Sequence, residues 1–428
     1  MKTNHQQIAP SKTNVIDRRQ ALVAASSAGL LYSFSLPLFT KRAEAASGQA
    51  SAVGAFVRVD SDETITIFIG VAEMGQGVLS GLAQVLAEEL MLDWSHVAVQ
   101  SAPANPAYGN PILRGTQATF GSLSMRGLFA PMRKAGAVVR EMLKMAAASA
   151  INAPISSLTA ANGAVFIAGT NSSLTYGALA FRAGQMTPPA DAPLLGSGRF
   201  IGTSIPRADI PVKVNGAAIF GIDVQLPGMV FAAVQNCPVA GGTTPAGFMP
   251  LSPSGTIAAV ALPTAVAVVA KDTYTAIRAA RNLSVPWTIP PGNSSISSAS
   301  ISAQAQQLMA TGTVQTAETV GFAQSAILAA AKKLDLTYSV PYLAHACMEV
   351  LNCTALVTAS TCTIWAPTQA QSAVVATATT ITGLPASAII VNTTFLGGGL
   401  GRKIEQDFIS QAIRIAQTEL LLVWLTPA

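Results

Sequence analysis

The chain has 428 residues, of which 50% are hydrophobic and only 11% are charged, and its formal net charge is +5. This length exceeds what one hydrophobic core usually supports, so we expect two or three domains. Residues 1–45 hold six Lys or Arg and two Asp or Glu, a net charge of +4, which leaves +1 for the remainder. The basic character therefore belongs to the N-terminus, and the composition indicates no nucleic-acid partner.

The first 45 residues have the layout of an export signal with a small-residue cleavage site after Ala45. Basic residues precede an uncharged stretch from Gln20 to Thr40, and Asp17-Arg18-Arg19-Gln20-Ala21-Leu22 resembles the twin-arginine motif, with Ala21 in place of the usual Phe. That route carries folded proteins, so we expect export to the periplasm. Two adjacent arginines by chance, or an uncleaved membrane anchor at residues 20–40, are the alternatives.

Two further uncharged stretches, residues 224–270 and 350–401, are interrupted throughout by Gly, Pro, Ser and Thr. Neither contains a clean run of ~18 apolar residues, which a membrane-spanning helix requires. Both stretches fit buried strands of a large soluble core better.

The four cysteines form no C-x-x-C pair and no zinc-like spacing with the three histidines; they are Cys237, Cys347, Cys353 and Cys362. An iron–sulfur cluster needs about four suitably placed thiolates, so we expect no cluster in this chain. Export permits a disulfide between Cys347 and Cys353, and buried free thiols are the alternative.

The mature chain begins with a strand, a glycine loop, a helix and a second strand. Thr64–Ile69 alternates as a strand does, and Glu73-Met74-Gly75-Gln76-Gly77 follows it. Apolar residues within 78–91 recur at helical spacing, and 96–100 again reads as a strand. A second amphipathic helix is predicted over residues 128–148.

The middle of the chain is less regular. Residues 154–195 are rich in turn formers and are predicted to be connecting structure. A β-rich segment is predicted from Arg207 to Trp287, and a linker from Pro290 through the serine-rich run to Ser302.

The last segment repeats the pattern of the first. A strand is predicted at 388–392, a glycine loop at Gly397–Gly401, a helix at 407–420 and a buried strand at 420–425.

Both glycine loops lie between a strand and a helix, where backbone N–H groups and the helix dipole favour an anion. Neither Gly75-Gln76-Gly77 nor Gly397–Gly401 has the Gly-Lys-Ser/Thr of a Walker A loop or the spacing of a Rossmann dinucleotide site. On its own, each loop is more commonly explained as a glycine turn that binds no ligand.

Several motifs in the same order resemble one family, from about residue 50 to the end. They are Glu73–Gly77, Ala87–Leu90, Thr119–Ser122, Gly136-Ala137, Arg140–Leu143, Arg207–Asp223, His345–Glu349, Pro367–Gln369 and Gly397–Arg402. Together they resemble the large subunits of the isoquinoline 1-oxidoreductase group, within the xanthine dehydrogenase and aldehyde oxidase superfamily.

The resemblance implies an α+β fold in which a molybdopterin-binding domain carries an inserted α/β hammerhead domain. The implied parts are the export signal (1–45), an N-terminal molybdopterin-binding segment (46–195), the hammerhead (196–290), a linker (291–314) and a first molybdopterin-binding domain, incomplete at the C-terminus (315–428). The glycine-loop segments precede the hammerhead here, which resembles the permuted order of the isoquinoline group.

The resemblance also implies roles for individual residues. Gln369 matches the glutamine beside the molybdenum oxo ligand, near the metal without being a direct ligand. The Gly75-Gln76-Gly77 loop and Gly121-Ser122 match segments that hold the pterin and its phosphates. The cofactor is implied to be molybdopterin, in its cytosine dinucleotide form.

Gly398, Gly399, Leu400 and Gly401 match the loop whose backbone lies against the metal centre, where the family usually has Phe in place of Leu400. Arg402 is predicted to pair with a phosphate or with Glu405 and Asp407. His345 and Glu349 sit four residues apart, yet a structural hydrogen-bonding role is favoured over metal binding because no third ligand is evident. Phe120 and Val350 also depart from the family's usual Gly and Pro.

Members of the family hydroxylate an electron-poor carbon with oxygen from water, using a glutamate base, and pass two electrons to iron–sulfur clusters. The implied substrate is an N-heterocycle or an aldehyde, and the implied partner is a small 2Fe–2S protein or another acceptor such as a cytochrome. The base lies in a Gly-Val-Gly-Glu-like motif, which this sequence lacks, so no catalytic base is assigned here. Family members continue for several hundred residues beyond the position of Trp424.

Three interpretations follow. The chain is an oxidoreductase subunit that works with a separate C-terminal fragment, a remnant without catalysis, or an exported module that binds an anionic ligand or cofactor through its glycine loops.

Overall fold

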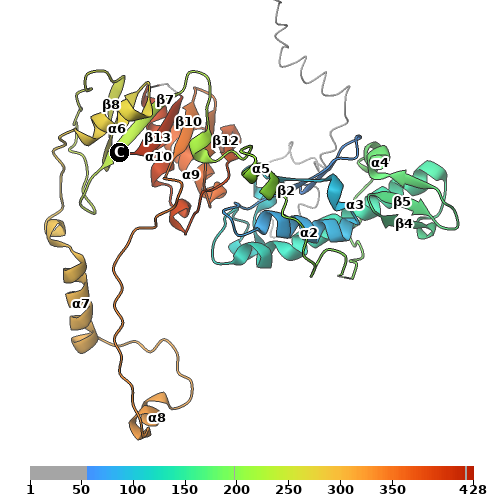
Figure 1. Cartoon of the computed structure of the whole chain (residues 1–428), viewed down its shortest axis with the longest axis horizontal. Coiled ribbons are helices and arrows are strands. Elements are labelled where there is room, and N and C mark those ends of the chain that lie inside the picture. The colour runs from blue at the N-terminus through green and yellow to red at the C-terminus, as the bar shows by residue number, and fades with distance from the viewer. Residues whose placement is uncertain (1–54, 197, 420–421) are drawn as a thin grey trace, which may run out of the picture. The chain divides into compact units, whose positions relative to one another are not determined.

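The computed structural model describes residues 55–428 except 197, 420 and 421, and the chain divides into two compact units. Of the described residues, unit 1 comprises 55–220 with Pro367–Ala376 and Ile390–Leu396, and unit 2 comprises the remainder (Figure 1). The division passes through α9 (Gln371–Thr382) and β12 (Ile389–Thr393). The predicted export signal lies outside the described residues, and no helix within the described part is long and apolar enough to cross a membrane.

Unit 1 is built on a three-stranded sheet in the order β1-β2-β3. β1 (Val57–Val59) pairs antiparallel with β2 (Ile65–Ile69), and β2 pairs parallel with β3 (Val97–Ser101). The crossover between β2 and β3 is helix α2 (Val78–Leu90), as a parallel pair requires. The strand, loop, helix and strand predicted from the sequence are therefore confirmed.

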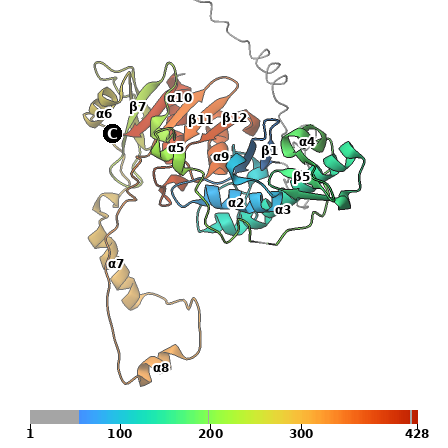
Figure 2. The same cartoon turned by 45° about the vertical axis from the view of Figure 1, so that its right-hand side comes forward.

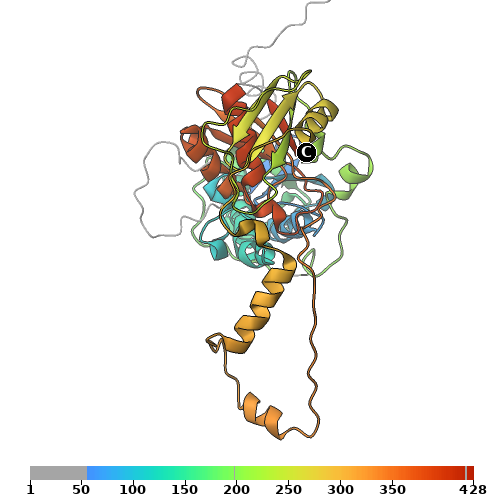
Figure 3. The ribbon, with the colours of Figure 1, turned by 90° about the vertical axis from the view of Figure 1, so that its left-hand side faces the viewer.

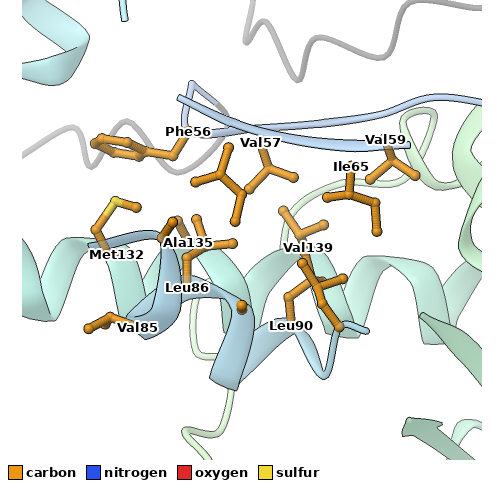
Figure 4. Close-up of a cluster of buried hydrophobic side chains, with 14 of the residues drawn as sticks. Phe56, Val57, Val59, Ile65, Val85, Leu86, Leu90, Met132, Ala135 and Val139 are labelled. Atoms are coloured by element: carbon orange, nitrogen blue, oxygen red, sulfur yellow. The ribbon is translucent and has the colours of Figure 1, made fainter. Parts of the chain in front are cut away.

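The long helix α3 (Leu123–Ile151) packs along α2, and both cover the sheet. Figure 4 shows strand side chains such as Val57 and Ile65 facing Leu86 of α2 and Val139 of α3. The helices approach so closely that a Cβ on Gly136 would lie 2.6 Å from the carbonyl oxygen of Leu86. The predicted helix thus exists, and it begins five residues before the predicted start at residue 128.

The interpretation of 154–195 as connecting structure was wrong, because an antiparallel sheet with the order β4-β5-β6 lies there. Asn162 and Gly163 have φ of 47° and 75°, the left-handed pair of a type I′ hairpin turn that joins the first two strands. The short strands alternate too briefly to stand out among turn formers. The elements are β4 (Leu158–Ala161), β5 (Ala164–Ile167), β6 (Ser173–Thr175) and α4 (Tyr176–Ala183).

A mixed seven-stranded sheet has the order β12-β11-β10-β13-β7-β9-β8, and all of its strands except β12 lie within unit 2 (Figure 2). All neighbouring pairs from β11 to β8 are antiparallel except β13 and β7, which are parallel. The strands are β7 (Val230–Asn236), β8 (Ala258–Leu262), β9 (Ala265–Ala270), β10 (Cys353–Val357), β11 (Cys362–Ala366) and β13 (Val423–Pro427). The predicted buried strand near the end of the chain is thus confirmed, and it occupies the middle of the sheet.

Helices α6 (Thr273–Arg281) and α10 (Asp407–Glu419) pack against this sheet. Every residue of β9 is buried, which explains why its sequence is continuously apolar rather than alternating. The apolar face of α10, with Phe408 and Ile415, is buried as its spacing predicts. All four cysteines are free thiols, so the Cys347–Cys353 disulfide considered above does not form.

The β-rich prediction for 207–287 holds only from β7 onward, since residues 210–214 form the short helix α5 (Ile210–Val214). Pro211 at the start of α5 suits a first helical turn. Within the predicted linker, α7 (Ser298–Thr311) begins with a capping box between Ser297 and Ser300. A second helix, α8 (Ala323–Ala329), follows, and none of its residues is buried.

Candidate functional site

The loop before α2 is organised by the buried carboxylate of Glu73. One carboxylate oxygen accepts from the backbone N–H groups of Gly75 at 2.8 Å and Gly77 at 3.1 Å, and the other accepts from Leu79 at 3.0 Å. These N–H groups lie at the positive end of the α2 dipole, where a negative charge is stabilised. A carboxylate of the chain itself therefore occupies the anion position that the glycine loop creates.

Gln76 folds its side chain back into the same loop. Its Oε1 accepts from the N–H of Met74 at 2.7 Å, and its Nε2 donates to the carbonyl of Ala72 at 2.9 Å. Arg207 supports the loop from outside by donating to the carbonyl of Gly75 at 3.1 Å. The loop is thus held in shape by its own side chains and by Arg207.

Arg207 is itself fixed by Asp209. The Asp209 carboxylate accepts from Arg207 at 2.9 and 2.6 Å and from Lys213 at 2.6 Å. Burial raises the pKa of Asp209, but the hydrogen bonds and charges of the two cations outweigh burial and bring this pKa to about 2. Asp209 therefore stays ionised and holds Arg207 against the loop at any physiological pH.

Thr119 joins three distant segments of unit 1. Its N–H donates to the carbonyl of Gln369 at 2.7 Å, and its own carbonyl accepts from the Gln369 Nε2 at 2.8 Å. Its Oγ1 accepts from the N–H of Ala72 at 2.9 Å, at the start of the glycine loop. Two residues away, the N–H of Gln117 donates to the Oγ of Ser372 at 2.9 Å. The loop before α2, the segment before α3 and the Gln369 segment therefore meet at one buried residue.

Gly121 and Ser122 directly precede helix α3 and have left-handed backbone, with φ of 61° and 56°. Both residues are exposed, and Ser122 makes no side-chain capping hydrogen bond to the first turn. The first N–H groups of a helix favour an anion. The start of α3 therefore differs from the start of α2, where Glu73 supplies the negative charge.

The second glycine loop, in unit 2, is a tight turn with several left-handed residues. Gly398 and Gly401 have φ of 91° and 85°, and Leu400 has φ of 52° with its side chain 61% exposed. The Cys347 thiol donates to the carbonyl of Gly399 at 3.3 Å. A non-glycine residue in this backbone region is unusual.

Glu349 fixes both ends of this loop. Its carboxylate accepts from the N–H of Gly397 at 2.8 Å and from the Nζ of Lys403 at 2.6 Å, and Lys403 is fully buried. The other oxygen accepts from Asn352 at 3.2 Å and from the N–H of Ile222 at 3.1 Å. Glu349 therefore has the structural hydrogen-bonding role that the sequence favoured over metal binding.

Arg402 forms a two-pronged ion pair with Asp407, with N–O distances of 2.9 and 2.5 Å. The hydrogen bond with Asp407 raises the pKa of Arg402. The pKa of Asp407 is lowered, because the Arg402 contact outweighs the opposing effect of burial. Of the two predicted partners, a phosphate or a neighbouring carboxylate, the structure contains the carboxylate pair.

The predicted site residues fall in two groups. Unit 1 brings Gln369 and the Gly75–Gly77 loop together through Thr119, two residues before Gly121, and unit 2 holds Gly398–Arg402. Within the described part of the chain, no group of three His, Cys, Asp or Glu residues could hold a metal ion.

Sequence reasoning missed the organising role of Thr119. This residue stands in a motif that the sequence had singled out, but its partners Ala72 and Gln369 lie far away in the chain.

Two family models, each described as a molybdopterin cofactor-binding domain, match residues 12–224 and 306–420. The chain is therefore a molybdopterin-binding protein with an α+β fold. It belongs to the xanthine dehydrogenase family, among the large subunits that bind this cofactor.

The beta subunit of isoquinoline 1-oxidoreductase from Brevundimonas diminuta is 32% identical over 416 residues, covering 85% of this chain and 52% of the relative. A nicotinate dehydrogenase subunit from Pseudomonas putida is 31% identical, covering 73% of this chain and 27% of the relative. The membrane-bound aldehyde dehydrogenase (pyrroloquinoline-quinone) of Gluconacetobacter polyoxogenes is 28% identical, with coverages of 93% and 53%. The chain thus spans about half the length of the isoquinoline and aldehyde dehydrogenase relatives and about a quarter of the length of the nicotinate relative.

Among solved structures, quinoline 2-oxidoreductase from Pseudomonas putida 86 aligns with a TM-score of 0.39 at 16% identity. The alignment covers 53% of this chain and 34% of that chain.

Proposed function

We propose that the chain is the cofactor-binding part of a molybdenum hydroxylase that oxidises an N-heterocycle or an aldehyde and passes the electrons to an iron–sulfur protein or a cytochrome. The observation that carries the proposal is the meeting of three loop segments at Thr119. Membership of the family and the names of the relatives support the reaction class.

The residues of unit 1 fit a pterin with phosphate groups in two respects. Gln369 is buried and its amide is oriented by Thr119, so its position is fixed before any ligand arrives. The start of α3 at Gly121-Ser122 offers exposed backbone that favours a phosphate. Molybdopterin, in our proposal the cytosine dinucleotide form, supplies the two-electron oxidation chemistry and the site of the water-derived oxygen when it is bound.

The backbone of Gly398–Gly401 is the corresponding segment of unit 2. Its glycines leave main-chain groups open to close approach by a ligand, and Glu349 and Lys403 hold the loop ends. A catalytic base is not assigned to any residue of this chain, and we propose that a further polypeptide segment completes the site.

Two observations favour the alternative of a non-catalytic remnant. Glu73 already fills the anion position before α2, and Asp407 already pairs with Arg402, so two of the proposed phosphate contacts have protein partners. A phosphate at either place would have to displace a carboxylate. The start of α3 is therefore a better candidate for binding a phosphate than the Gln76 loop is.

We further propose export to the periplasm by the twin-arginine route, which suits a protein that acquires its cofactor before transport. The test is the cellular location of the full chain with Arg18 and Arg19 both replaced by lysine. Retention of the double variant in the cytoplasm supports the route, and unchanged export contradicts it.

The function is tested by expressing the full chain in a host that makes molybdopterin, with and without a polypeptide that corresponds to the unmatched half of the Brevundimonas relative. Molybdenum is measured by metal analysis, and dye reduction is measured with isoquinoline and with an aldehyde. Molybdenum bound to the chain in both samples, with dye reduction only in the two-part sample, supports the proposal. A soluble, metal-free chain in both samples contradicts it and favours the remnant.

A further inference from the structure

Residues 334–342, which we call the unpaired strand, alternate strictly between apolar and other side chains. The intervening positions are Asp335, Thr337, Ser339 and Pro341. The apolar members are all strongly exposed: Leu334 is 89%, Leu336 66%, Tyr338 85%, Val340 87% and Tyr342 68% exposed. Alternation with this period predicts a strand with one buried face, yet here that face is in water.

Among the residues that the structure describes, none pairs with the unpaired strand in a sheet. Residues 333–346 carry no regular secondary structure, and Figures 1 and 3 show an extended trace between α8 and β10. Its aromatic and β-branched residues favour an extended, paired backbone. Extended backbone leaves its N–H and C=O groups available, as they are in a strand that adds to the edge of another sheet.

Pro341 determines which side of the strand is available for pairing. In a strand, the N–H groups of alternate residues point to the same side, and Pro341 lacks one. The edge with the N–H groups of residues 335, 337 and 339 is interrupted at Pro341, and we call it the outer side because it is less suited to pairing. The opposite edge keeps the N–H groups of all five even-numbered residues from Leu334 to Tyr342, and we call it the complete side.

We propose that the unpaired strand adds, as an edge strand, to the sheet of a second polypeptide that corresponds to the unmatched half of the curated relatives. The inference rests on the proposed function, because it identifies the surface that receives the completing segment.

The occupant is argued from three facts. The cofactor-binding domain model that matches residues 306–420 includes the unpaired strand, so these residues belong to the domain. The Brevundimonas relative is only half covered by this chain, so it contains a further half that could supply a sheet. Pairing with a second copy of the unpaired strand would give only a two-stranded ribbon, which is marginally stable in water. A partner sheet with an apolar layer would also cover the exposed apolar face.

The experiment uses the full chain and, as the probe, the unmatched half of the Brevundimonas relative expressed as a separate polypeptide. Binding is measured by titration, and amide hydrogen exchange is followed across residues 333–343. We expect a one-to-one complex in which the amides of the even-numbered residues from Leu334 to Tyr342 become slow to exchange. The apolar face carries no charge, so binding should change little between low and high salt.

Proline variants test the predicted side of pairing. Leu336→Pro removes an N–H on the complete side and should weaken binding about tenfold, the equivalent of one main-chain hydrogen bond lost and left unpaired. Thr337→Pro is the matched control, because it removes an N–H on the outer side and should leave binding within about twofold. Leu336→Ala separates the loss of the side chain from the loss of the N–H.

Equal weakening by the proline variants at 336 and 337 would overturn the proposal, as would the absence of a complex. Slow exchange of the even-numbered amides in the chain alone would also overturn it. If this slow exchange is independent of concentration, it indicates pairing within the chain, and if it grows with concentration, it indicates pairing between two copies. Molybdenum content, measured on the same samples, separates the two claims. A complex without molybdenum contradicts the proposed function but not the strand pairing. Molybdenum without a complex contradicts the strand pairing but not the proposed function.

Discussion

Replacing Lys403 with methionine tests whether the second glycine loop depends on the buried ion pair. The Lys403 Nζ lies 2.6 Å from the Glu349 carboxylate, and Lys403 is fully buried. Breaking such a pair costs about 3–5 kcal/mol, because the remaining charge is left buried without its partner. The N–H groups of Gly397 and Ile222 and the amide of Asn352 still donate to Glu349, so we expect the lower end, about 3 kcal/mol.

The assay is urea unfolding followed by tryptophan fluorescence, since three of the four tryptophans (Trp287, Trp365 and Trp424) lie in unit 2. Lys271→Met, at an exposed lysine of the same unit, is the matched control and should cost well under 1 kcal/mol. Combining Lys403→Met with Glu349→Gln removes both charges, so the double variant should cost less than the sum of the single ones. A loss below about 1 kcal/mol for Lys403→Met, or strict additivity, refutes the reasoning.

Three further predictions concern other buried contacts. Thr119→Val should cost about 1–3 kcal/mol in thermal unfolding because a buried N–H loses its acceptor, whereas Thr119→Ser should not; equal losses contradict this. The pKa of Asp209 is lowered from 3.8 to about 2, so the Asp209 carboxylate contributes fully to the free energy of unfolding above pH 4, and this contribution is lost as the pH falls through 2. In Asp209→Asn, the free energy of unfolding should therefore fall less steeply between pH 4 and pH 2 than in the wild type. Gly397→Ala should cost about 1–3 kcal/mol in urea unfolding, because its Cβ would lie 2.4 Å from the Cβ of Glu349, while Gly196→Ala, in open space, should be neutral.

The local elements of both units were predictable because their periodicity is strong. The strand at 65–69, the helix at 78–90 and the helix at 407–419 all lie within a few residues of the prediction. Apolar residues at every second position identify a strand, and apolar residues three and four positions apart identify a helix, without any tertiary information. The hairpin at 158–167 was missed, although Asn162-Gly163 between two short apolar runs is a recognised hairpin signal.

The contacts that organise the candidate site were not predictable, because they join residues far apart in the chain. Gln369 is 250 residues from Thr119, and Lys403 is 54 residues from Glu349. Nothing in the local sequence indicates that the Glu73 carboxylate fills the loop that its own glycines create. The motif resemblance indicated which segments matter, and only the fold indicates which side chains hold them in place.

The most direct test of the central claim is the molybdenum and pterin content of the full chain, purified from a host that makes molybdopterin. Metal analysis and fluorescence of the oxidised pterin would be compared between the wild type and Thr119→Val, with Thr119→Ser as the matched control. We predict close to one molybdenum and one pterin per chain for the wild type and Thr119→Ser, and a clear loss for Thr119→Val. Folded wild-type protein that holds neither molybdenum nor pterin would contradict the claim.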